Sequence, residues 1–232
     1  MKASDIVALP LQLGSAIRHR RVFHPLGVLA EGHLRRTAPV GEGLPIESAD
    51  ILGRVSKAVG VPGSLPDLVG LAWRIPPPTP AKTPWDVLLV SAGSGLLTRF
   101  VLRPTSSWTG TTLTTLMPLR HGNDWWWVRA ELKSQVGEGL SLADVSAAIA
   151  GDGIVFDVTQ ARGTGPFLPL ATLELTKVVP TDEKHDVSFD PTRNSAPGVG
   201  LGPQWLTTLR ERAYLRSRRG RHAPPVDHPA TR

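Results

Sequence analysis

Short apolar and β-branched segments, separated by turns rich in Pro and Gly, recur along most of this 232-residue chain. Such segments predict short strands. They lie at residues 87–90, 99–102, 154–158 and 168–178. Residues 111–117 and 124–132 predict a hairpin around the turn at 120–123. Many short strands with closely spaced turns favour a closed antiparallel β-barrel, so we expect a mainly β fold with helices, of the α+β class.

Helical patterns are few and lie in the second half of the chain. Ser141 is a suitable N-cap for a helix over 141–149, because Asp144 follows three residues later as in a capping box. Residues 204–219 predict a second helix that ends at a glycine. Between the two, residues 180–204 are rich in Pro, Gly and Asp and predict a long ordered loop.

Composition limits the classes of function. The chain has no cysteine, which excludes disulfides, thiolate metal sites and cysteine nucleophiles. We expect a cytoplasmic protein without a membrane partner, because the N-terminus lacks the apolar core of a signal peptide and no segment approaches the roughly 18 apolar residues of a membrane span. We expect an N-terminal arm over residues 1–20, a barrel domain with a C-terminal helix over 21–221, and a disordered tail over 222–232.

Positive charge is concentrated near the C-terminus. The net charge is +6 and the sequence pI is about 10.3. Six arginines and one glutamate lie between Arg210 and Arg221. Such a cluster can attract nucleic acid or another anion, and it can equally be a solvated basic tail.

Tyr214, the only tyrosine of the chain, lies inside this cluster. Arg210 precedes it by four residues, so the two side chains share one face of a helix. A neighbouring cation favours the phenolate and lowers the pKa of a phenol, which is ordinarily about 10. A phenolate binds ferric iron well and is one of the axial ligands of haem. The alternative is an exposed Arg-rich helix that carries one amphipathic Tyr.

Several short motifs follow one another in a fixed order. The series consists of Arg21-Val22-Phe23-His24-Pro25-Leu26-Gly27 with Gly32 after it, Arg54-Val55-Ser56, Trp85-Asp86-Val87-Leu88, a strand-like segment at 169–175, Phe189-Asp190-Pro191, Pro197-Gly198-Val199 and Arg210-x-x-x-Tyr214. In order and spacing it resembles the catalase family, in particular the haem-binding core of that family in a minimal single-barrel form. The resemblance covers about residues 20–221 and implies a barrel of the catalase core type.

The resemblance also implies a cofactor, haem b with its iron. Tyr214 would be the axial ligand of the iron, and Arg210 would keep the phenol ionised. Arg21, Arg54 and Arg221 would pair with the haem propionates, since a planar guanidinium binds a carboxylate through two parallel hydrogen bonds.

On the distal side of the haem, the resemblance implies that His24 is the catalytic acid and base. It would take a proton from a bound peroxide and return it to the leaving oxygen. Ser56 would support His24 by a hydrogen bond that fixes the tautomer of the ring. The family also has a distal Asn, whose place falls at Val90 here, and the neighbouring Ser91 would face the opposite side of a regular strand. The family's R-x-F-x-Y motif has Arg212 at its third position here.

These differences favour peroxidase-type or specialised haem chemistry over efficient catalase turnover. The expected substrate is hydrogen peroxide, an organic hydroperoxide or another oxidised small molecule. Two alternatives remain open: a non-catalytic haem carrier or sensor, and a basic nucleic-acid-binding module without a cofactor, which we favour least. Trp125, Trp126 and Trp127 are interpreted as core or as a surface through which a homodimer could form.

Overall fold

The computed structural model describes residues 26–60, 65–77, 79, 83–95, 98–99, 101–180 and 187–202. The expected N-terminal arm, the helix at 204–219 and the C-terminal tail lie outside these residues. The described part is mainly β with one α-helix, and its strands form a single antiparallel sheet.

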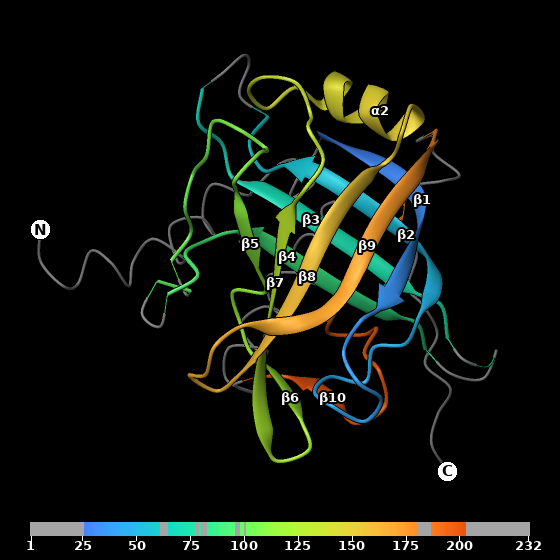
Figure 1. Ribbon diagram of the computed structural model, residues 1–232, viewed down its shortest axis with the longest axis vertical. Helices are drawn as coiled ribbons and strands as arrows, with labels where there is room; N and C mark the ends of the chain where they lie inside the picture. Colours follow the sequence, from blue (N-terminus) through green and yellow to red (C-terminus); the bar gives the residue numbers. More distant parts are fainter. Residues whose placement is uncertain are drawn as a thin grey trace, which may run out of the picture.

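Eight antiparallel strands close into a barrel (Figure 1), which confirms the expected closed antiparallel β-barrel. They are β1 (Leu26–Arg36), β2 (Ala49–Lys57), β3 (Val69–Ile75), β4 (Trp85–Ser91), β5 (Thr112–Thr114), β7 (Asp124–Leu132), β8 (Ile154–Arg162) and β9 (Leu168–Val179). Around the ring their order is β7, β5, β4, β3, β2, β1, β9 and β8. Pairing of β8 with β7 closes the ring, so neither strand is left with an open edge.

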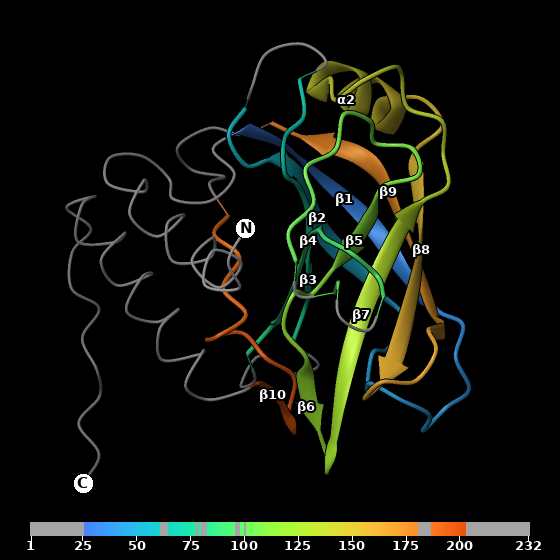
Figure 2. The same ribbon diagram turned by 90° about the vertical axis from the view of Figure 1, so that its left-hand side faces the viewer.

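Smaller elements lie at the two ends of the barrel (Figures 1 and 2). The helix α2 (Leu142–Ala150) lies at one end and begins where expected, since the Ser141 hydroxyl accepts the Asp144 N–H at 3.1 Å. At the other end, β6 (Leu119–His121) pairs with β7, and β10 (Val199–Leu201) pairs with β6. These short strands extend the sheet beyond the ring.

Alternation along the strands separates the inside of the barrel from its outside. On β2 and β3, Ile51, Val55, Leu71 and Trp73 belong to the buried core. The residues between them therefore point outward, because successive side chains of a strand face opposite sides. Gly32 allows β1 to approach β9 closely, since a Cβ there would lie 2.0 Å from the Glu174 carbonyl oxygen on β9.

The structure corrects one expected strand and adds a short strand to the expected hairpin. At the strand expected over 99–102, Arg99 lies in a turn, because the N–H groups of Thr98 and Arg99 donate to the Gly95 carbonyl at 3.1 and 2.9 Å. Leu102 forms an isolated antiparallel bridge with Ala92. The hairpin expected from 111–117 and 124–132 is confirmed in outline, because β5 pairs antiparallel with β7 and the tight turn lies at Gly122 and Asn123, within the expected 120–123. The short strand β6, which was not expected, lies between them and leads into that turn. The expected loop at 180–204 contains the short strand β10.

Candidate functional site

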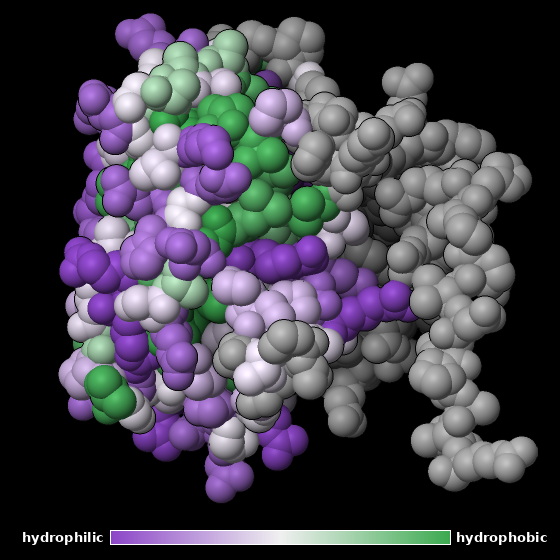
Figure 3. Space-filling view, turned by 90° about the vertical axis from the view of Figure 1, so that its right-hand side faces the viewer, coloured by the Kyte–Doolittle hydropathy of each residue, from purple (hydrophilic) through white to green (hydrophobic). Residues whose placement is uncertain are grey.

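The outside of β1 to β4 carries a row of small residues. Gly27 is paired with Ser56, Ser56 with Gly70, and Gly70 with Val90. These four residues therefore form one row across the sheet, with one residue on each strand. The next row consists of Leu29, Arg54, Ala72 and Leu88. We call these eight residues the outer face. Figure 3 shows the side of the molecule that β1 and β2 occupy in Figure 1, where hydrophobic side chains gather into one area among mainly polar ones.

Two residues of the expected haem site, Arg54 and Ser56, lie together on the outer face. The Arg54 side chain is half-buried, and its Nε lies 2.7 Å from the place that a Cβ on Gly27 would occupy. Arg54 therefore passes close to β1 at a point where only glycine leaves room. Ser56 is 6% exposed, and its hydroxyl donates a long bond of 3.5 Å to the Gly70 carbonyl. A bond of that length contributes little, so the hydroxyl can accept and donate elsewhere.

Val90 and Ser91 face opposite sides of β4, as expected. Val90 lies in the row of Ser56 on the outer face. Ser91 is buried, and its hydroxyl accepts the Val69 N–H at 3.1 Å. Ser91 is thus held in place by the backbone of β3 and does not supply a polar group to the outer face. Within the eight residues of that face, Arg54 and Ser56 are the polar side chains.

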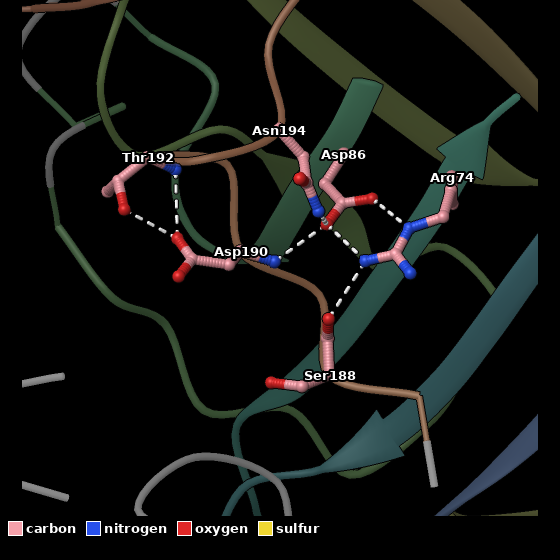
Figure 4. A network of polar contacts seen from close by, with 6 residues as sticks. All are labelled: Arg74, Asp86, Ser188, Asp190, Thr192 and Asn194. Carbon is pink, nitrogen blue, oxygen red and sulfur yellow. Dashed lines mark hydrogen bonds and ion pairs between the residues drawn. The ribbon is translucent and has the colours of Figure 1, made fainter. Parts of the chain in front are cut away.

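A polar network beside the outer face joins two of the sequence motifs (Figure 4). The Asp86 side chain has no exposed surface and accepts hydrogen bonds from Arg74 Nε at 2.6 Å and Nη2 at 2.7 Å. It also accepts the Asp190 N–H and the Asn194 side-chain amide, both at 2.7 Å. Arg74 Nη2 donates further to the Ser188 carbonyl at 2.8 Å. The W-D motif of β4 and the F-D-P motif after β9 therefore meet at one carboxylate.

The cation of this network is stabilised by its partner. The hydrogen bond to Asp86 raises the pKa of Arg74 above its ordinary value, although burial opposes the shift. The Arg74 guanidinium also lies over the Phe189 ring, 5.4 Å from its centroid. The sequence motifs include Asp86 and Asp190, but they include neither Arg74 nor Asn194. The pairing of Arg74 with Asp86 depends on the register of β3 and β4, which no short motif carries.

A second buried cation lies on the outside of β7. Arg99 is 4% exposed, donates to the Gly163 carbonyl at 3.1 Å, and lies over the rings of Trp127 and Phe167 at 5.2 and 5.3 Å. Arg129 lies over Phe167 as well, at 4.5 Å. Burial lowers the pKa of Arg99. These contacts hold Arg99 against β7 and against the turn between β8 and β9.

The remaining expected site residues, Arg21, His24, Arg210, Tyr214 and Arg221, lie outside the described residues. Among the residues that are described, no group of three or more His, Asp or Glu side chains is arranged to hold a metal ion. The same part of the chain contains no helix of the length and apolar character that crossing a membrane requires.

Comparison with known proteins gives no assignment: no family model matches the chain, and no curated protein matches it significantly. The resemblance to catalases therefore depends on the short sequence motifs alone. The barrel and the positions of Arg54, Ser56 and Val90 come from the structure.

Proposed function

We propose that this protein is a catalase-like haem enzyme that binds haem b against the outer face of β1 to β4. It acts on hydrogen peroxide or organic hydroperoxides, through peroxidase-type or specialised haem chemistry rather than efficient catalase turnover. One observation carries the proposal. Arg54 and Ser56, which the catalase resemblance assigns to the haem site, lie together on the outside of a closed antiparallel barrel, beside the small residues Gly27 and Gly70.

The outer face has the properties that a planar group with carboxylates requires. Gly70 has no side chain, and Ser56 and Ala72 have short ones, so these residues place little bulk between a flat group and the backbone of the sheet. Arg54 offers a half-buried guanidinium next to them, and a guanidinium binds a carboxylate through two hydrogen bonds. A propionate is such a carboxylate, and the residues present therefore fit haem.

The resemblance to catalases implies the following roles for the residues. When bound, haem supplies a redox-active iron at which an O–O bond can be cleaved. Tyr214 holds the iron as a phenolate, and Arg210 favours the ionised form of that phenol. His24 takes a proton from the peroxide oxygen that it contacts and returns it to the leaving oxygen. Ser56 holds the imidazole of His24 in one tautomer.

The arginines and the apolar residues of the site determine what binds. Arg21, Arg54 and Arg221 hold the cofactor by its propionates. Val90 and Leu88 give the outer face an apolar side, and such a surface orients an organic group by packing. Hydrogen peroxide has no such group and depends on hydrogen bonds for its orientation. An organic hydroperoxide is therefore the substrate that this face favours.

The decisive experiment is an absorption spectrum of the purified, haem-reconstituted chain, beside the variant Tyr214→Phe. We expect one haem per chain with a Soret band of tyrosinate-ligated ferric iron. Phe occupies the same space without an oxygen ligand, so we expect the variant to lose most of its haem. A wild-type sample without a Soret band would refute haem binding, and an unchanged spectrum in the variant would assign the axial ligand to another residue.

A haem carrier or sensor is the second candidate, and it is favoured by the small number of polar side chains on the outer face. A peroxide assay separates the two functions. The enzyme cleaves an alkyl hydroperoxide while it oxidises a dye, and His24→Ala lowers that rate by about 10²–10⁴ while haem is retained. A carrier binds haem and gives the same background rate with and without His24.

A further inference from the structure

A segment of the chain that is about one hundred residues away in sequence crosses the outside of β3 and β4. We call residues 187–202 the crossing segment. Figure 4 shows its first part, in which Asp190 and Asn194 contact Asp86, Ser188 contacts Arg74, and Thr192 contacts Asp190. The Asp86 side chain accepts two bonds from the barrel, both from Arg74, and two from the crossing segment. The Asp86 N–H also donates to the Asn194 carbonyl at 3.0 Å.

The crossing segment is folded so that it presents these donors. The Asp190 carboxylate accepts the Thr192 N–H at 3.0 Å and the Thr192 hydroxyl at 2.5 Å. The N–H of Asn194 donates to the Asp190 carbonyl at 2.9 Å. These bonds make a compact turn that directs the Asp190 N–H and the Asn194 amide to the same oxygen of Asp86. The fold of the turn and its attachment to the barrel thus depend on each other.

A second attachment lies at the end of the crossing segment. The strand β10 pairs with β6, and the Gly202 N–H donates to the Pro118 carbonyl at 3.1 Å. A Cβ on Gly202 would lie 1.8 Å from the Trp125 ring, so the ring packs directly on the backbone there. The course of the chain up to residue 202 is therefore fixed at two places, Asp86 and Trp125. Arg210 and Tyr214 follow shortly afterwards in sequence.

We propose that Asp86 is a positioning residue: it fixes the crossing segment on β3 and β4, and thereby the place from which the chain continues to the proposed ligand pair Arg210 and Tyr214. The part of this inference that concerns the ligand pair rests on the proposed function. The attachment itself does not. A buried carboxylate is stable only while its donors are present, and removal of its charge weakens the hydrogen bonds that the crossing segment donates to it.

The test uses Asp86→Asn in the full-length chain, with Asp157→Asn as a matched control. Asp157 lies on β8, its side chain is half exposed, and it pairs with Lys133 at 3.1 Å. Hydrogen exchange is measured by mass spectrometry on the haem-free protein. We expect hydrogen exchange over residues 187–202 to become at least about tenfold faster in Asp86→Asn and to stay unchanged in Asp157→Asn. Only the first variant weakens the hydrogen bonds that hold this segment on the barrel.

A second measurement follows haem itself. In reconstituted protein, transfer of haem to an apoglobin scavenger should become at least about tenfold faster in Asp86→Asn, with a weaker tyrosinate charge-transfer band. Asn194→Ala removes one donor and leaves the Arg74 pair intact, so a smaller change in the same direction is expected. This milder variant keeps the test decisive if Asp86→Asn does not fold.

The outcomes separate the two proposals. If the wild-type chain binds no haem, the proposed function fails, and hydrogen exchange alone decides whether Asp86 holds the crossing segment. If haem binds and is lost equally fast from wild type, Asp86→Asn and Asn194→Ala, Asp86 does not position the ligand pair. If hydrogen exchange over residues 187–202 is unchanged in Asp86→Asn and in Asn194→Ala, the inference is overturned entirely.

Discussion

At the scale of single residues, the chemistry of the outer face depends on which side chain stands at a few fixed positions. Val90 and Ser56 lie in one row, separated by Gly70. A polar side chain at residue 90 would therefore face the same space as the Ser56 hydroxyl. Gly27 has a different task, since its missing side chain makes room for Arg54.

The substitution Val90→Asn should shift activity toward hydrogen peroxide. A side-chain amide in this row can hold the second oxygen of hydrogen peroxide, and a positioned donor of this kind changes a rate by about 10²–10³. We expect oxygen evolution from hydrogen peroxide to rise relative to dye oxidation with an alkyl hydroperoxide. Leu88→Asn places the same amide on the same face in the next row, and it should not produce this change. Equal ratios in wild type and Val90→Asn would show that the missing amide does not determine the substrate.

The substitution Gly27→Ala should destabilise the barrel. The new Cβ would lie 2.7 Å from Arg54 Nε and 2.8 Å from the Val55 carbonyl oxygen, so backbone as well as side chain must move. We expect a loss of about 1–3 kcal/mol in the free energy of unfolding, measured with urea. Gly200→Ala is the control, because no atom lies within 4 Å of a Cβ there, and its effect should stay within about 0.5 kcal/mol. Similar losses in both variants would contradict the crowding at Gly27.

At the scale of elements, local patterns predicted the strands and the helix whose ends carry strong signals. Strands β4, β8 and β9 lie where the apolar runs predicted them, within a few residues. The helix α2 begins at its predicted N-cap. The strand expected over 99–102 was wrong at Arg99, where hydrogen bonds to Gly95 make a turn that outweighs β-propensity. The strand β6 was missed because three residues carry too little periodicity.

The cap of α2 can be tested directly. Ser141→Ala removes the oxygen that accepts the Asp144 N–H and should lower the free energy of unfolding by about 1 kcal/mol. Ser141→Asp supplies another good N-cap acceptor and should retain most of the stability. Thermal or urea unfolding of both variants checks the result. If Ala and Asp behaved alike, the cap bond would contribute nothing measurable.

At the scale of the whole molecule, the net positive charge of the chain comes from residues outside the described barrel. The described residues contain acidic and basic side chains in nearly equal number, whereas the C-terminal cluster between Arg210 and Arg221 is strongly basic. The proposed function assigns two of its arginines, Arg210 and Arg221, to the phenolate and a propionate. They would then be engaged with the cofactor rather than with phosphate groups.

Binding of nucleic acid should accordingly be weak and without sequence preference. We expect fluorescence anisotropy with labelled oligonucleotides to show affinity that falls steeply as salt rises, as for any non-specific basic surface, and that is the same with and without haem. Tight binding of one defined oligonucleotide at physiological salt would instead favour the nucleic-acid-binding module.

The sequence by itself determined the class of the fold, the position of the α2 cap and the identity of the residues expected to form the site. These depend on alternation, turn residues and capping, which are local properties that neighbouring residues decide. Arg54, Ser56 and Asp86 also belong to the ordered sequence motifs, so the sequence identified them before their contacts were known.

Only the tertiary structure decided which of these residues meet. The register of β1 to β4 places Gly27, Ser56, Gly70 and Val90 in one row, and a shift by one residue would turn Ser56 into the core. The network around Asp86 joins β3, β4 and a segment about one hundred residues later. No local pattern encodes such contacts, because they form only when closure of the barrel brings distant segments to the same surface.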